Sequence, residues 1–198
     1  MYQNDIWSIN MASDNKMNLV ILGLLDHEDL TGYDIKKRID GSLRYFWKGS
    51  FGSIYPALSS LEESGLIKKV KGKSSSTGRG KIVYKITAAG RKNLLAWLSE
   101  SKSSNSLKYE TLLKLYFGGV ADNEVSIATI TEFEKEVEAD LAVLNTYKKN
   151  LNKVLDERDH VFFYLTVTFG IETYEAYLRW CADAKKILSG KKIVRSKR

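Results

Sequence analysis

Runs of apolar residues and their spacing predict a series of helices and strands in the first half of the chain. Residues 17–25 are almost entirely apolar, which indicates a buried helix. Thr31 can cap a second helix over residues 32–43, because its hydroxyl accepts a hydrogen bond from a free N–H group of the first turn. Residues 1–15 show no clear period, and we expect either a frayed extension or an arm that packs on a partner subunit.

A third helix is indicated by apolar side chains at i, i+4 and i+7, the stripe that faces a core, namely Ile54, Leu58 and Leu61. Two starting points are open for this helix. Pro56 would bend a helix that begins at Ser50, because proline lacks the N–H group that an interior position needs. A helix that begins near Tyr55 accommodates the same proline at its start.

Two strands and a fourth helix are predicted next. Residues 66–71 and 81–87 are rich in β-branched residues, and the polar loop 72–80 that joins them is too long for a two-residue hairpin. Thr87 then caps a helix over residues 88–99. The predicted order is therefore helix, helix, helix, strand, strand, helix.

The second half of the chain is predicted to be helical. A serine-rich linker at residues 102–106 leads to helices expected over residues 107–117, 122–159 and 161–188. The second of these repeats apolar residues every seven positions, as a coiled coil does. The third is apolar nearly all round and must be covered, either by a second subunit or by an intramolecular three-helix bundle. The residues expected at a dimer interface are Ile130, Val137, Leu141, Leu144, Leu151, Phe163, Val167, Tyr174 and Leu178.

Composition narrows the class of protein. The 198 residues include one cysteine, Cys181, which excludes an intramolecular disulfide and suits a reducing cytosol. No apolar run approaches the roughly 18 residues that a membrane span needs, and the N-terminus lacks the pattern of a signal peptide. We therefore expect a soluble, cytoplasmic protein.

Positive charge is concentrated in the first half. The chain has a formal net charge of +7, residues 64–99 contain no acidic residue, and residues 190–198 form a basic tail. A folded segment of one charge sign attracts polyanions. A solvated basic face is the plainer interpretation of charge taken alone.

The predicted elements and the charge together indicate a mainly α fold. We expect a winged helix-turn-helix over residues 16–100 (three helices, a two-stranded wing and one further helix), followed by an α-helical dimerisation domain over residues 107–189. A helix of this fold enters the major groove of DNA, and the tip of the wing reaches an adjacent groove or the phosphates. Basic side chains of the wing would supply most of the affinity by displacing counterions.

The third helix itself contains no basic residue, so we expect small hydroxyl groups and Tyr55 to read the bases. Tyr55 could instead be a packing residue, and the wing run could be a plain flexible loop. The residues expected to contact DNA are Ser50, Gly52, Ser53, Tyr55, Pro56, Ser59, Lys71, Lys73, Ser74, Thr77, Arg79, Lys81, Lys36 and Lys37.

Three segments of the first half carry a family resemblance. They are Gly32-Tyr33-Asp34-Ile35, the stretch from Ser53 to Ile67 (SIYPALSSLEESGLI), and the stretch from Tyr84 to Gly90 (YKITAAG). This pattern resembles the PadR-like transcriptional regulators. Residues 110–119 and 170–180 are similar to the helical C-terminal domain of the larger subgroup, which includes the virulence activators.

The resemblance implies a homodimer that binds an inverted-repeat operator, usually as a repressor and sometimes as an activator. Some members of the family release DNA when they bind phenolic acids or other small aromatic effectors. The aromatic residues that would line such a ligand site, or else form part of a core, are Tyr116, Phe117, Tyr164, Phe169 and Trp180, with Tyr174 beside them. The extension at residues 1–15 is longer than the family needs, and Met11 or Met17 is an alternative start.

Catalytic and metal-binding chemistry find little support. His27 and His160 lie far apart in sequence, and Cys181 within an apolar segment is expected to be a small core residue. We expect no cofactor, no metal and no enzymatic activity. The competing interpretation is a winged-helix module that binds another protein and interacts with DNA weakly or not at all.

Overall fold

The structure is a computed structural model, and it describes residues 4–47, 51–71, 82–101, 103, 105 and 108–190. Only the backbone is described for residues 4–15, 51 and 71. The chain divides into two compact units, Met1–Ser104 and Asn105–Arg198. None of the helices in the described ranges is long and apolar enough to cross a membrane.

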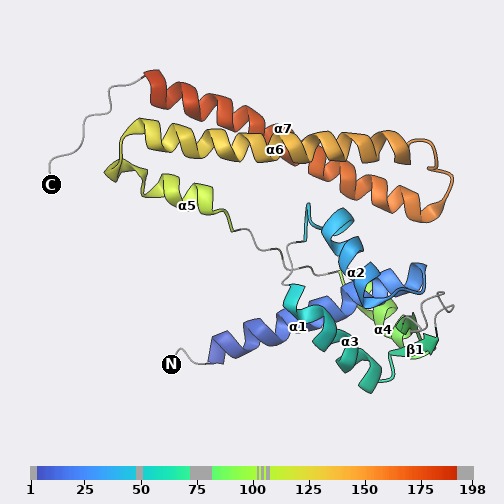
Figure 1. Cartoon of the computed structure of the whole chain (residues 1–198). Helices are drawn as coiled ribbons and strands as arrows, with labels where there is room; N and C mark the ends of the chain where they lie inside the picture. The colour runs from blue at the N-terminus through green and yellow to red at the C-terminus, as the bar shows by residue number, and fades with distance from the viewer. Residues whose placement is uncertain are drawn as a thin grey trace, which may run out of the picture. The chain divides into compact units, whose positions relative to one another are not determined.

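The first unit contains the predicted succession of helices, strands and helix (Figure 1). The elements are α1 (Asn4–His27), α2 (Gly32–Arg38) with a π-helical turn (Ile39–Leu43), a 3-10 turn (Phe51–Ser53), α3 (Ile54–Glu63), β1 (Ile67–Lys71), β2 (Ile82–Ile86) and α4 (Ala88–Leu98). The two strands pair antiparallel, with Ile67 opposite Ile86. The expected winged helix-turn-helix fold is confirmed.

The start of α3 settles the question that Pro56 raised. Ser53 is the residue before the helix, so Pro56 is its third residue, where the missing N–H group has no intrahelical acceptor to satisfy. The helix therefore begins close to Tyr55 and not at Ser50.

The beginning of α1 differs from the sequence-based expectation. We expected a helix from residue 17, preceded by either a frayed extension or an arm that packs on a partner subunit, whereas one helix runs from Asn4 to His27. The segment before Met17 contains neither proline nor glycine, and adding turns to an existing helix costs far less than nucleating a new one. A helix nucleated by the buried segment 17–25 can therefore extend over residues that lack an apolar period.

The core of this unit joins α1, α2, α3 and both strands. Ile21 and Leu22 of α1 are fully buried, as are Ile35 of α2 and Leu58 of α3. Ile67 of β1 and Ile86 of β2 complete this core. Two backbone hydrogen bonds also join Leu30 to Tyr84, at 3.2 and 2.8 Å, and so tie the segment before α2 to β2. The wing is thus fixed at its base to the helices.

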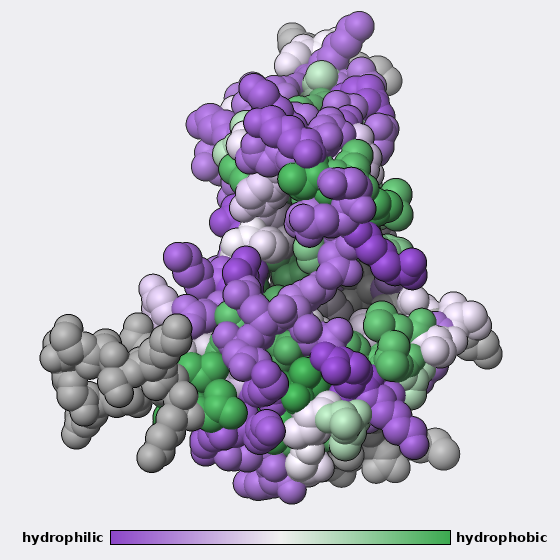
Figure 2. Space-filling model, turned by 90° about the vertical axis from the view of Figure 1, so that its right-hand side faces the viewer, coloured by the Kyte–Doolittle hydropathy of each residue, from purple (hydrophilic) through white to green (hydrophobic). Residues whose placement is uncertain are grey.

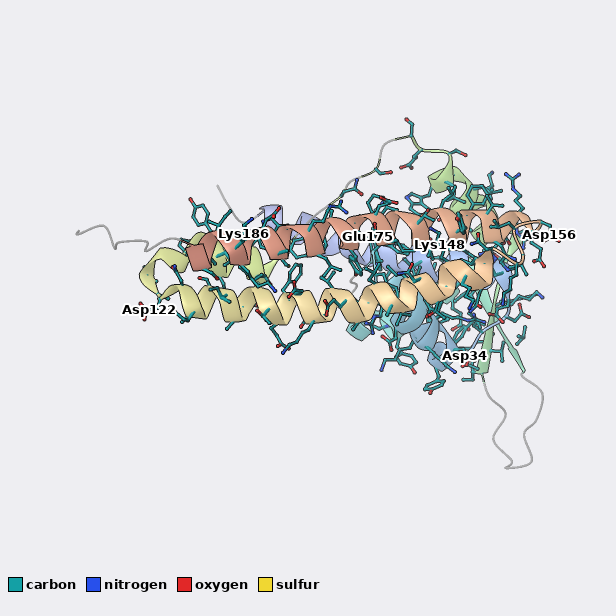
Figure 3. The ribbon with its side chains drawn as sticks, turned by 90° about the horizontal axis from the view of Figure 1, so that it is seen from above. Asp34, Asp122, Lys148, Asp156, Glu175 and Lys186 are labelled. Atoms are coloured by element: carbon teal, nitrogen blue, oxygen red, sulfur yellow. The ribbon has the colours of Figure 1, made fainter. Side chains whose placement is uncertain are left out.

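The second unit is an antiparallel pair of long helices with a short helix beside it. Its elements are α5 (Glu110–Tyr116), a 3-10 turn (Gly118–Val120), α6 (Asn123–Leu151) and α7 (Arg158–Gly190). Figure 3 shows α6 and α7 side by side, with Asp122 and Lys186 at one end and Lys148 and Asp156 at the other. The helix expected over residues 122–159 ends at Leu151, because a turn at residues 152–157 reverses the chain.

The seven-residue repeat of α6 lies inside a single chain. Ile130, Val137 and Leu144 are buried within this unit, and a methyl group on Gly170 of α7 would lie 2.9 Å from Leu144 Cδ1. We expected this seam between two subunits. It lies instead between α6 and α7, because the tight turn after Leu151 folds α7 back along the apolar stripe of α6.

Candidate DNA-binding surface

A capping box fixes the start of α2. Asp34 N donates to Thr31 Oγ1 at 3.1 Å, and Thr31 N donates to Asp34 Oδ2 at 3.3 Å, so each side chain satisfies a free backbone N–H group of the other residue. Gly32, the first residue of the helix, is buried against α3. The beginning of α2 is therefore held in one position relative to α3.

The helix α3 separates its core residues from an exposed face. Ala57, Leu58 and Leu61 are buried, whereas Tyr55, Pro56 and Ser59 are exposed. Among the other predicted contact residues, Gly52 is exposed and Ser53 is half-buried at the start of the helix. The structure thus brings five predicted DNA contacts to α3 and to the 3-10 turn just before it.

Tyr55 lies at the surface and also touches α2. Its side chain is 65% exposed, which is incompatible with a core position. A Cβ atom on Gly32 would lie 3.0 Å from Tyr55 Cε1, so the ring rests against the first turn of α2. One edge of the ring is packed and the rest faces solvent.

Tyr33 is a surface residue that sequence reasoning did not include among the DNA contacts. It is 71% exposed and lines a hollow of about 390 Å³ together with Tyr55 and Ile82. Thr31, Gly32, Asp34 and Tyr84 complete the lining of that hollow. Tyr33 belongs to the Gly-Tyr-Asp-Ile segment, which carried the family resemblance, and its position in the first turn of α2 was the available indication.

Many basic side chains of this unit are paired with carboxylates. Glu28 binds Arg38, Lys69 Nζ lies 2.6 Å from Glu62, Lys85 Nζ lies 3.3 Å from Asp29, and Arg91 Nε lies 2.6 Å from Asp26. The hydrogen bond to Glu62 raises the pKa of Lys69 above its ordinary value. These charges are partly neutralised within the chain.

Lys36 and Lys37 are the predicted phosphate contacts that the structure describes. Both are exposed in the last turn of α2, and neither forms an ion pair within the described ranges. Lys71 is described by its backbone alone, at the end of β1. The remaining predicted contacts lie outside the described residues and stay predictions, namely Ser50, Lys73, Ser74, Thr77, Arg79 and Lys81.

The residues expected to line a ligand site do not come together. Tyr116 and Phe117 pack edge to face at the end of α5, with ring centroids 5.1 Å apart, and both are exposed. Phe169 is 68% exposed, and Tyr164 is half-buried elsewhere on α7. Trp180 joins an aromatic cluster through Phe133 at 6.4 Å, and Tyr174 joins the same cluster through Tyr177 at 5.8 Å.

That aromatic cluster is built around residues that sequence reasoning missed. Tyr109, just before α5, packs edge to face on Phe133 at 6.0 Å and on Tyr177 at 5.6 Å, and the two tyrosine hydroxyls share a hydrogen bond. Burial and that hydrogen bond raise the pKa of Tyr109 above its ordinary value. Tyr174 OH donates to Asp140 Oδ2 at 3.4 Å nearby.

His27, His160 and Cys181 all lie within the described residues. No three His, Cys, Asp or Glu side chains among them converge as a metal site would require. Cys181 is buried, and burial raises the pKa of its thiol, which disfavours the reactive thiolate. Polar side chains of α2, α3 and β2 do share one surface hollow, which Tyr33, Asp34, Tyr55 and Tyr84 help to line.

A core-anchored helix with an exposed polar face, followed by a two-stranded wing and a capped helix, defines a winged helix-turn-helix DNA-binding protein. Residues 21–96 match the model of the "Transcriptional regulator PadR-like family", and residues 107–189 match that of the "Virulence activator alpha C-term" domain. Residues 21–96 are thus similar to the PadR-like family of transcriptional regulators, and the helical unit that follows is similar to the C-terminal domain of virulence activators.

Relatives of known structure cover nearly the whole chain. The negative transcriptional regulator PadR of Bacillus subtilis is 26% identical over 172 residues, which are 83% of this chain and 92% of that protein. Its structure in complex with operator DNA matches with a TM-score of 0.73 at 26% identity, covering 86% of this chain and 98% of that one. That protein has also been solved in complex with p-coumaric acid, with a TM-score of 0.69 over 87% of this chain and 98% of the other, at 26% identity.

Two further structures show the same organisation. A PadR-like transcriptional regulator of Bacillus cereus matches with a TM-score of 0.73 at 28% identity, covering 89% of this chain and 99% of that one. The virulence activator AphA of Vibrio cholerae matches with a TM-score of 0.67 at 26% identity, covering 88% and 98%. The mainly α fold, with a winged helix-turn-helix followed by a helical region, is therefore shared by all of them.

Proposed function

We propose that this regulator is a homodimeric repressor that binds an inverted-repeat operator through α3 and the wing. The observation that carries the proposal is the exposed face of α3, which is anchored by a buried stripe, while α2 presents the exposed Lys36 and Lys37. The similarity to a negative regulator solved with operator DNA supports the direction of control. Residues 16–100 would form the DNA-binding domain and residues 107–189 the dimerisation domain.

An exposed apolar stripe on α7 supports dimerisation. Phe162, Leu165 and Phe169 follow at i, i+3 and i+7, and the exposed Ile187 lies on the same side of the helix. The opposite side of α7 is the one that packs on α6, through Gly170 and Ile171. Figure 2 shows that hydrophobic residues, in green, are exposed at the surface of the molecule among hydrophilic ones, in purple. A second copy that covers this stripe would form a helical bundle around it.

Several residues that the sequence predicted at the dimer interface are packed within their own chain. Ile130, Val137 and Leu144 are buried in their own chain, and Tyr174 contacts Asp140 of α6. Leu141, Leu151, Val167 and Leu178 are half-buried, and Phe163 is exposed. The dimer contact that we propose therefore uses the α7 stripe.

A small aromatic effector is the third element of the proposal. The aromatic cluster of Tyr109, Phe133 and Tyr177 joins apolar ring faces to hydroxyl groups, which is the chemistry that a phenolic ligand requires. The B. subtilis relative solved with p-coumaric acid supports a ligand of this class.

Operator binding is tested by a gel shift with the DNA upstream of the protein's own coding region, followed by a footprint. We expect protection of two half-sites related by a two-fold axis, and lower expression of a reporter placed behind that DNA. Failure to bind any duplex at low ionic strength would contradict the proposal and favour the protein-binding module instead.

Dimerisation is tested by sedimentation of the Phe169→Glu variant. The added charge on an exposed apolar stripe should give monomers that bind the operator far more weakly, because the two DNA-binding domains are then no longer linked and cannot occupy both half-sites together. The control is Asn150→Glu, which places the same charge at an exposed position near the end of α6. A dimer that persists in Phe169→Glu would rule out the α7 stripe as the interface.

A further inference from the structure

The exposed face of α3 lacks the side chains that usually distinguish base pairs. Guanine is read by Arg or Lys, and adenine by Asn or Gln, through paired hydrogen bonds in the major groove. The sequence of α3, Ile54–Glu63, contains none of these four residue types. Direct readout by this helix therefore cannot use these paired hydrogen bonds to purines, and has to rest on single bonds from serine or glutamate or on another feature of the bases.

The first turn of α3 offers apolar surface to a groove. Tyr55 and Pro56 are consecutive and both exposed, so an aromatic ring and a pyrrolidine ring are both presented at the end of the helix that enters DNA in this fold. The hollow beside Tyr55 is bordered by two more exposed apolar side chains, Tyr33 and Ile82. The major groove presents one apolar group of its own, the C5 methyl group of thymine.

The position of Tyr55 is fixed before DNA binds. Its ring rests on Gly32, where a Cβ atom would approach Cε1 to 3.0 Å, and the capping box of Thr31 and Asp34 holds Gly32 in place. The backbone bonds between Leu30 and Tyr84 fix the same turn to the wing. A ring held in this way loses little conformational entropy on binding, which favours selective contact.

We propose that Tyr55 and Pro56 select thymine in each operator half-site by packing against its C5 methyl group. The inference rests on the proposed operator binding and adds the chemical feature that is recognised. Ser59, one turn further along the exposed face, is left to bond phosphate or base edges. Specificity would thus come from methyl groups, and affinity from the lysines and arginines.

The test begins with duplexes selected by the full-length protein from a random library. Each thymine of a selected half-site is then replaced singly by deoxyuridine, which keeps the base pair and removes only the methyl group. We expect a roughly fourfold loss of affinity for each contacted methyl group, as burial of one methyl-sized group implies. Tyr55→Ala should bind the thymine duplex more weakly and no longer distinguish it from the deoxyuridine duplex, whereas Tyr55→Phe should retain the distinction.

Leu95→Ala serves as the matched control, because Leu95 is an exposed apolar residue of α4, at 56%, and takes no part in the proposed contact. It should discriminate as the wild-type protein does. Equal affinity of the wild-type protein for thymine and deoxyuridine at every position would overturn the inference while operator binding stands. Discrimination that survives in Tyr55→Ala would also overturn it, and a library that yields no bound duplex would overturn operator binding itself.

Discussion

Gly90 should be the glycine least tolerant of substitution among those of the described structure. It lies in the first turn of α4, where its N–H group donates to the capping hydroxyl of Thr87 at 3.1 Å. A Cβ atom at this position would lie 2.1 Å from the carbonyl oxygen of Leu66 and 2.9 Å from Ile86 Cγ1. The nearest obstacle is backbone at the base of the wing, so no side-chain rotation can relieve the clash.

The cost of Gly90→Ala follows from what must move. The helix or the strand has to shift by roughly 1 Å, and overpacking of this kind costs about 1–3 kcal/mol. Leu66 O also accepts hydrogen bonds from Thr87 N and Thr87 Oγ1, both at 3.0 Å, and weakening one of them adds about 1 kcal/mol. We therefore expect a loss of about 3 kcal/mol from the free energy of unfolding of the DNA-binding unit.

Guanidinium denaturation measures this loss, with hydrogen exchange of the peptides around residues 66–98 to locate it. Gly23→Ala is the matched control, because it adds the same methyl group to the interior of α1 with no atom within 4 Å, and alanine favours a helix over glycine. Gly23→Ala should leave stability unchanged or raise it slightly. A midpoint for Gly90→Ala equal to that of the wild-type protein would refute the close packing of α4 on the wing base.

Three further predictions concern both units. Leu144→Ala should lower the free energy of unfolding of the helical unit by about 2–5 kcal/mol in urea denaturation, because Leu144 is only 2% exposed. Val143→Ala should cost far less, because Val143 is 37% exposed. Equal losses for the two variants would contradict the seam between α6 and α7. The pKa of Tyr109 is raised by burial and by Tyr177, so its neutral form is favoured by folding, and the stability it contributes should be lost as pH rises above the ordinary tyrosine value of about 10. Urea midpoints compared from pH 8 to 11 should fall more steeply for the wild-type protein than for Tyr109→Phe, and parallel curves would contradict this. Lys36→Ala with Lys37→Ala should lower the salt dependence of duplex binding by about 0.9 in log–log slope for each phosphate that these lysines neutralise, and an unchanged slope would remove α2 from the interface.

The winged helix-turn-helix could be predicted because its determinants are local in sequence. The stripe of Ile54, Leu58 and Leu61 has helical spacing, and Thr87 caps α4 as its position before Ala88 indicates. The two strands were recognisable from β-branched residues on either side of a polar loop. Each of these features depends on neighbours a few residues away.

The features that sequence reasoning missed depend on distant contacts or on cooperativity. Tyr109 and Tyr177 meet although they are 68 residues apart, and no spacing rule connects them. The seven-residue repeat in α6 indicates an apolar partner but cannot tell whether that partner is α7 of the same chain or a second copy. The extension of α1 to Asn4 arises from helix propagation, which leaves no apolar period to detect.

The proposed DNA binding depends on basic residues of the wing that neutralise phosphates of the duplex. The most direct test is the dependence of duplex affinity on salt concentration, for the wild-type protein and for a variant in which Lys71, Lys73, Arg79 and Lys81 are changed to alanine. We expect a shallower slope of log affinity against log salt concentration for the variant, by about 0.9 for every phosphate that the wing no longer neutralises, together with weaker binding at low salt. Identical slopes and affinities for the two proteins would contradict it.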